Sequence, residues 1–158
     1  MTTKIQEPLA AYRFIVEIED GGSAVQAAFT AFSGIRARTE TVTARTGAEP
    51  RGVLRHIPAL TTYENASLTK GVIGGGVLLD WLKRVAPGNS AAASGKNMFR
   101  KVNIYALDYA GTRAIRWTLY DALPVSYELA EMDALQNAVL SEKVEFAYHG
   151  YSREVLKG

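Results

Sequence analysis

Apolar and polar side chains alternate with a period of two along several segments of this chain, and this pattern limits the fold more than any other feature of the sequence. Residues 12–19 read YRFIVEIE, and residues 113–120 (RAIRWTLY) and 139–151 (VLSEKVEFAYHGY) alternate in the same way. Such alternation is typical of strands with one buried face and one wet face. With the shorter strand-like segments between them, it predicts a mainly β protein of about seven or eight strands.

In the last of these strands, the alternation assigns each side chain to a face. Ser141, Lys143 and Glu145 fall on the wet face. The core face is predicted to carry Leu140, Glu142, Val144, Phe146 and Tyr148. Earlier in the chain, QAAFTAFSGI at 26–35 is expected to supply one strand. VLRHI and NASLTKGV are expected to supply two more, separated by a turn at 58–63 that begins with Pro58.

One segment has helical spacing instead. Its apolar residues recur at intervals of three and four, with Trp81 beside them, and Pro87 follows. We therefore expect a helix over 77–86, anchored to the sheet by Trp81, Leu82 and Val85. The length of 158 residues suits a single domain, 1–158. Around the helix and strands, we expect an N-terminal arm over 1–9, an extended loop over 44–54 and a flexible surface loop over 87–98.

Composition excludes several functional classes. The formal net charge of +2 is too small to indicate nucleic-acid binding by electrostatics alone, and the absence of cysteine excludes disulfides and thiolate metal sites. No segment approaches the roughly 20 apolar residues that a membrane-spanning helix needs. We therefore expect a soluble protein, without stable membrane insertion, that is made and assembled in the cytoplasm.

Three consecutive glycines, Gly74 to Gly76, precede the helix and raise the possibility of a phosphate site. A P-loop would need a lysine and a hydroxyl residue at the helix start, where this chain has Val77 and Leu78. A dinucleotide fingerprint would need glycine or alanine at position 79, which is leucine. The glycines are therefore interpreted as a hinge that admits unusual dihedral angles.

No other pattern indicates catalysis. The chain has two histidines, His56 and His149, without zinc-ligand spacing, and it has no G-x-S-x-G elbow. We expect no catalytic residue, no metal and no cofactor. The protein is therefore predicted not to be an enzyme.

The segment RARTETVTAR, at 36–45, has the threonines of a strand but no row of large apolar side chains on either face. Such a strand gains little from its own core. We expect it to be stabilised by water on one face and by hydrogen bonds to neighbouring strands, including strands of another chain.

Five segments, taken in order, resemble the tail-tube proteins of contractile phages and related contractile injection systems. The resemblance covers roughly residues 8 to 155. The segments are YRFIVEI, AFSGIRARTETV, YENASLTKGV with LLDWLKRV, RAIRWTLYDALPVSYE, and NAVLSEKVEFAYHGY.

The resemblance implies a two-sheet β-sandwich or barrel-like fold with one flanking helix, assembled into hexameric rings that stack as a hollow tube. It also implies the partners: further copies of the chain, a contractile sheath protein, baseplate and terminator or cap proteins, and DNA or protein cargo in the lumen. The location implied is a virion tail or an injection-system particle. The alternative that the residues leave open is a free-standing small β-barrel that binds a ligand or nucleic acid.

The same resemblance suggests two groups of site residues. The long charged loop would contact the next ring through Arg45, Glu49, Arg51, Arg55 and His56. The water-facing sides of the strands would line the lumen through Arg38, Glu40, Thr41, Lys143 and Glu145.

Overall fold

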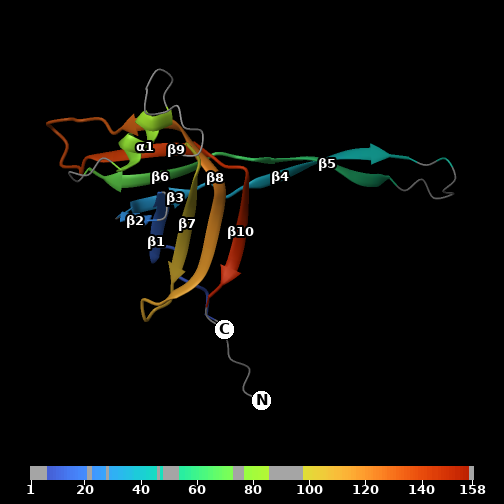
Figure 1. The fold of residues 1–158 in the computed structure, drawn as a ribbon, viewed down its shortest axis with the longest axis horizontal. Helices are drawn as coiled ribbons and strands as arrows, with labels where there is room; N and C mark the ends of the chain where they lie inside the picture. The colour runs from blue at the N-terminus through green and yellow to red at the C-terminus, as the bar shows by residue number, and fades with distance from the viewer. Residues whose placement is uncertain are drawn as a thin grey trace, which may run out of the picture.

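A computed structural model describes residues 7–20, 23–27, 29–45, 47, 54–72, 77–85 and 98–156. Within these residues the chain forms ten strands and one helix, so the mainly β class is confirmed (Figure 1). The strands are β1 Phe14–Asp20, β2 Ser23–Ala27, β3 Phe29–Ser33, β4 Ala37–Ala44, β5 Arg55–Tyr63, β6 Ala66–Gly71, β7 Arg100–Leu107, β8 Arg113–Leu129, β9 Ser141–Ala147 and β10 Gly150–Val155. The helix is α1 Val77–Val85.

Most strands belong to one bent sheet in the order β2-β1-β7-β8-β9-β6-β3, and β10 also pairs with β8. The 17-residue strand β8 belongs to both halves of this sheet. Its first part pairs with β7 and β10, and its second part, from Leu123 to Leu129, pairs with β9. We call β1, β2, β7, β10 and the first part of β8 the A layer. The B layer consists of β3, β6, β9 and the second part of β8.

The two layers meet at a corner in β8. Asp121 has a positive φ of 50°, which bends the strand there. The segment between β9 and β10, which lies beside β8, bends at the same level. There the amide of His149 donates a hydrogen bond to the carbonyl of Tyr120 over 3.0 Å. In Figure 1, β7 and β10 therefore run down the view, whereas β6 and β9 run across it. The expected fold, with two β layers and one helix, is confirmed for the described residues.

Both layers bury side chains in one shared core. β6 and β9 each alternate regularly between buried and partly exposed residues, as a period-two pattern requires. The large side chains that are fully buried are Val16, Ile18, Leu68, Leu78, Trp81, Val102, Leu119, Val144 and Phe146. They come from β1, β6, β7, β8, β9 and α1, so the helix contributes to the same core as the sheet.

The helix α1 lies where residues 77–86 are expected to be helical. The indole of Trp81 is fully buried, its centroid lies 6.2 Å from that of Phe146, and its Nε1 donates to the carbonyl of Met98 over 3.0 Å. Leu82 is half-buried, and Val85 packs against the edge of the core. Among the described residues, no helix is long and apolar enough to cross a membrane.

Three strand boundaries differ from those expected. The chain forms no turn at 58–63, because β5 continues through Pro58 as far as Tyr63. Pro58 pairs with Thr41 next to a register shift, and β5 has a partner strand on only one side among the described residues. Edge strands and bulges are the places in a sheet where a proline can be accommodated without the loss of a ladder hydrogen bond.

The other two differences divide segments that were expected to be single strands. The segment 26–35 contributes to two strands because the chain leaves the A layer after Ala27, where β2 ends, and enters the B layer at Phe29. The segment 139–151 also divides, because its two halves follow β8 around the corner as β9 and β10. The N-terminal arm lies mostly outside the described residues, and the loop 87–98 does so except for Met98.

Candidate assembly surfaces

The strands β4 and β5 form a separate two-stranded sheet that projects from the body of the molecule (Figure 1). We call these two strands the β4–β5 arm. All its side chains are exposed except those of Ala44 and Tyr63, which are half-buried. An isolated two-stranded ribbon is at best marginally stable in water, because it has no core of its own. The arm is therefore a candidate for a surface that another chain covers.

The arm has two chemically different faces. Alternation along β4 places Arg38, Glu40 and Val42 on one face, and the cross-strand partner of Val42 is Ile57. Both of these apolar side chains are exposed. The opposite face is rich in threonine, and its Thr39 and Thr61 hydroxyls lie 2.9 Å apart, within hydrogen-bonding distance.

The structure shows where the stacking and lumen candidates suggested by the sequence lie on the arm. Of the stacking candidates, Arg45, Arg55 and His56 are exposed at the outer end of the arm, and Glu49 and Arg51 lie outside the described residues. Of the lumen candidates on β4, Arg38 and Glu40 share a face, whereas Thr41 belongs to the threonine-rich face. One face of the arm therefore cannot present all three.

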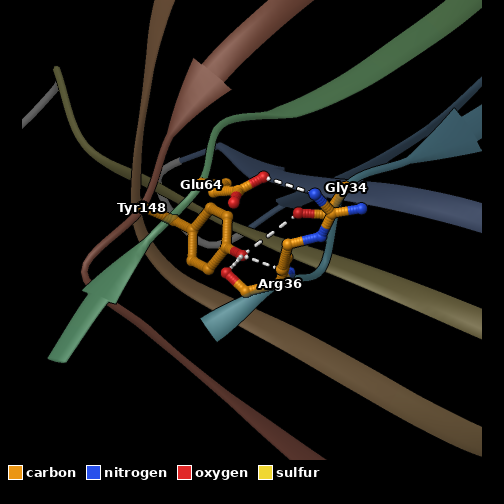
Figure 2. Close-up of polar contacts among 4 residues, drawn as sticks. All are labelled: Gly34, Arg36, Glu64 and Tyr148. Atoms are coloured by element: carbon orange, nitrogen blue, oxygen red, sulfur yellow. Dashed lines mark hydrogen bonds and ion pairs between the residues drawn. The ribbon is translucent and has the colours of Figure 1, made fainter. Parts of the chain in front are cut away.

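The backbone at the root of the arm is tightly constrained. Gly34 has a φ of 103°, and a Cβ atom there would lie 2.6 Å from the carbonyl oxygen of Asn65. Glycine adopts such an angle without strain and leaves room for the neighbouring backbone. Beyond it, Arg36 and Glu64 join the two strands through an ion pair of 3.0 Å and a backbone hydrogen bond of 3.0 Å (Figure 2).

Tyr148 connects this root to the core. Its hydroxyl accepts a hydrogen bond from the amide of Arg36 over 3.2 Å, and it lies 3.2 Å from the carbonyl of Gly34, to which it can donate (Figure 2). Burial raises the pKa of Tyr148 because the phenolate form would lose its hydration. The ring of Tyr63, the last residue of the arm, lies 5.6 Å from that of Tyr148. The direction of the arm is thus fixed by a buried residue of the domain.

The outer face of the B layer is the second candidate surface. Lys143 and Glu145 lie there and are half-exposed, with the Nζ of Lys143 4.0 Å from the Oε1 of Glu145. Val144 and Phe146 are buried on the opposite face of the strand. The predicted division of this strand into faces is therefore confirmed by its burial pattern. Lys143 and Glu145 are on a different sheet from Arg38, Glu40 and Thr41, so the structure does not bring the five lumen candidates together.

Sequence reasoning did not identify the residues that complete this face. Register pairs Lys143 with Thr69 and Glu128, and Glu145 with Ser67 and Ser126. Ser33 follows on β3, with its hydroxyl 2.8 Å from that of Ser67. The alternation of Ala66, Leu68 and Lys70 with Ser67 and Thr69 was the available signal. The outer face of the B layer is consequently lined with small hydroxyl groups and a few charges of both signs.

The B layer also has two open edges. The strand β3 pairs only with β6, and the part of β8 from Leu123 to Leu129 pairs only with β9, among the described residues. Open edges present unpaired backbone donors and acceptors, to which a strand of another chain can add. No three histidine, aspartate or glutamate side chains in the described part of the chain are grouped so that they could hold a metal ion.

The fold resembles those of chains in several assemblies. A chain in the six-fold symmetrised baseplate of the anti-feeding prophage has a TM-score of 0.79 and 23% identity, and the match covers 97% of this chain and 99% of that chain. A chain in the sheath–tube complex of the PVC extracellular contractile injection system also has a TM-score of 0.79 and 23% identity, with coverage of 96% and 95%. A chain in the tail of an empty GTA particle, with C6 symmetry, has a TM-score of 0.56 and 12% identity, with coverage of 91% and 96%.

The sequence itself gives the more specific match. No curated protein matches it. The family model of the T4-like virus tail tube protein gp19, however, matches residues 10–152, which include every strand except the end of β10. This match spans most of the chain and both layers of the fold, and it agrees with the resemblance of the five sequence segments. The chain therefore belongs to the tail tube protein family of T4-like viruses, represented by gp19.

Proposed function

We propose that this protein is the repeating subunit of the inner tube of a contractile tail or injection system, in which six copies close into a ring and the rings stack. Membership of the tail tube family supports the tube, and the open-edged, polar B layer is the structural observation that carries the proposal. The number six follows the symmetry of the anti-feeding prophage baseplate and of the GTA tail, whose chains share this fold.

Ring closure would join the two open edges of the B layer. In this arrangement, β3 of one copy pairs with the second part of β8 of the next copy, so the B layers form one continuous barrel. The core face of each B layer is already covered by the A layer and by α1. The face that remains for the lumen is the polar one, which carries Lys143 and Glu145. A contact between two different edges produces a closed ring when the rotation from one subunit to the next is a whole-number fraction of a full turn.

This lumen surface suits a channel through which cargo passes. Its described side chains are short hydroxyl groups with Lys143, Glu145 and Glu128 among them. Because charges of both signs are interspersed, no broad field of one sign would hold a charged cargo in place. The β4–β5 arm continues the pair of strands β3 and β6 beyond the B layer. One of its two faces would therefore extend the polar lumen surface past the rim of the ring, either the face with Arg38 and Glu40 or the face with Thr41.

The role is geometric rather than catalytic, and the partners follow from the assembly. We assign the outer surface to a contractile sheath protein and the ends of the tube to baseplate and terminator or cap proteins, with DNA or protein as cargo. Chains that share this fold occur in a sheath–tube complex, a baseplate and a tube-terminating cap. The particle would be assembled in the bacterial cytoplasm. The free-standing binding module finds no support, because the family model is that of a tail tube protein and the structures matched at 23% identity come from particle assemblies.

Stacking is assigned to the β4–β5 arm, through its exposed apolar pair and through Arg45, Arg55 and His56; Glu49 and Arg51 continue the same loop in the sequence. The double variant Val42→Glu/Ile57→Glu is expected to form single rings that do not stack, because the contact would then require the burial of two unpaired carboxylates. Both side chains are exposed in the single subunit, so the variant should unfold at the same denaturant concentration as the wild type.

The experiment compares sedimentation and negative-stain images of wild type and variant at equal concentrations. Val155→Glu is the matched control, since Val155 is a similarly exposed valine on β10, away from the arm. It should polymerise as the wild type does. If Val42→Glu/Ile57→Glu forms filaments of normal length, then the arm is not part of the stacking contact.

A further inference from the structure

The loop between β8 and β9, residues 130–140, exposes large apolar side chains that the fold does not use. Leu135 is 95% exposed, Val139 is 86% exposed and Met132 is 71% exposed. Three such side chains in one short loop form an apolar surface of the kind that contacts between proteins cover. The sequence predicted no role for residues 130–138, and it predicted that residues 139 and 140 would begin the last strand, which in the structure starts at Ser141.

The conformation of the loop is supported by its own hydrogen bonds. A carboxylate oxygen of Asp133 accepts from the amide of Leu135 over 2.9 Å, and the carbonyl of Asp133 accepts from the amide of Gln136 over 3.2 Å. At the base, the amide of Ala130 donates to the carbonyl of Ser141 over 2.9 Å. The loop therefore presents Leu135 on a defined turn, which lowers the entropy that a docking partner would have to remove.

Register places this loop and the β4–β5 arm at opposite ends of the B layer. Leu129 pairs with Glu142 and Ser141 pairs with Gly71 at the loop end. At the other end, Ala66 pairs with Phe146, three residues from the end of the arm at Tyr63. Figure 1 shows the same arrangement, with the β8–β9 connection on the left and the arm extending to the right.

The two features are also complementary in charge. Beyond its root, the arm's described charged residues are three arginines and one glutamate: Arg38, Arg45, Arg55 and Glu40. The loop carries Glu131 and Asp133, and the sequence has no lysine or arginine between positions 117 and 142. Each feature also exposes apolar side chains, which are Val42, Ile57 and Leu60 on the arm.

An open, head-to-tail assembly needs two different surfaces that fit each other and face opposite ways. The arm and the loop meet this condition in position, in charge and in apolar character. We propose that the β8–β9 loop is the docking surface for the β4–β5 arm of a second copy of this chain in the next ring. The proposal rests on the stacked-ring function proposed above and names the partner surface that the arm contacts.

Cysteine cross-linking tests this pairing directly, because the natural chain contains no cysteine. Leu135→Cys is combined in turn with Val42→Cys, Ile57→Cys or Leu60→Cys, and the assembled protein is oxidised and run on a non-reducing denaturing gel. A disulfide forms only when the two Cβ atoms can approach to about 4 Å. The loop and the arm lie at opposite ends of one subunit, so a bond between them joins two copies. A regular ladder of multimers is expected from at least one of the three pairs.

The control is Leu135→Cys with Val155→Cys, which should give no ladder because Val155 lies on β10, outside both surfaces. Each variant is also imaged, which separates this inference from the function on which it rests. Stacked rings without a ladder from any arm position would overturn the docking of arm to loop and leave the tube intact. A wild-type protein that forms no rings would overturn both.

Discussion

Replacing Trp81 with alanine is expected to lower the free energy of unfolding by about 3–5 kcal/mol. The indole is fully buried, it packs against Phe146, and its ring lies 5.4 Å from the guanidinium carbon of Arg100. Its removal would leave a cavity and would also deprive the carbonyl of Met98 of its donor. Since a domain of ordinary stability has only about 5–15 kcal/mol in total, this loss would be a large fraction of its stability.

Denaturant unfolding, followed by far-ultraviolet circular dichroism below the concentration at which rings stack, measures this loss. Val85→Ala is the matched control on the same helix, because Val85 is only partly buried and loses a smaller side chain. Its destabilisation should be clearly smaller. An unchanged denaturation midpoint for Trp81→Ala would contradict the packing described here and would place this face of α1 outside the core.

Replacing Lys70 with methionine is expected to cost a similar amount, about 3–5 kcal/mol, for an electrostatic reason. The ammonium of Lys70 lies 3.1 Å from a carboxylate oxygen of Glu142, and the two side chains are only 7% and 9% exposed. The other oxygen of Glu142 accepts from the hydroxyl of Tyr127 over 2.8 Å, and this hydrogen bond raises the pKa of Tyr127. Loss of Lys70 would leave a buried carboxylate without a countercharge.

The double variant Lys70→Met/Glu142→Gln isolates that cause. Glutamine removes the second charge, and its side-chain carbonyl can still accept from Tyr127, so most of the stability should return. Both proteins are compared with the wild type by chemical denaturation at neutral pH. If the double variant is as unstable as Lys70→Met, then packing rather than the unpaired charge is responsible for the loss.

The period-two pattern was sufficient to predict much of the fold. It assigned Leu140, Glu142, Val144, Phe146 and Tyr148 to the core face of the last strand. The last four are buried, whereas Leu140 precedes β9 and is half-buried. It could not predict the partner of Glu142, because Lys70 is brought opposite it only by the register between β6 and β9. A charged residue in a core pattern needs a buried partner, but the pattern does not identify that partner.

The strand boundaries that were predicted wrongly depend on contacts distant in sequence. A proline normally interrupts a strand, but Pro58 is accommodated because one side of β5 has no neighbour among the described residues. The division of 139–151 into β9 and β10 depends on the bend of β8 at Asp121, which is another part of the chain. Local sequence signals contain neither fact.

The candidate surfaces were predictable only in part. The polar strand from 36 to 45 correctly indicated a strand without its own core, because β4 is exposed on both faces. The separation of Thr41 from Arg38 and Glu40 follows from simple alternation, but which face meets the lumen depends on neighbouring copies. Residues 130–138 of the exposed loop had no recognisable pattern, since a few apolar residues between acidic ones are compatible with a buried turn as well as with a docking surface.

The most direct test of the tube is a helical reconstruction, by electron cryo-microscopy, of the filaments formed by the purified wild-type chain. We expect rings of six subunits whose B layers form a continuous inner barrel, with Lys143 and Glu145 facing the lumen and the β4–β5 arm reaching the adjacent ring. Monomers at every concentration, or filaments in which Lys143 and Glu145 face the outer surface or a buried contact, would contradict this expectation.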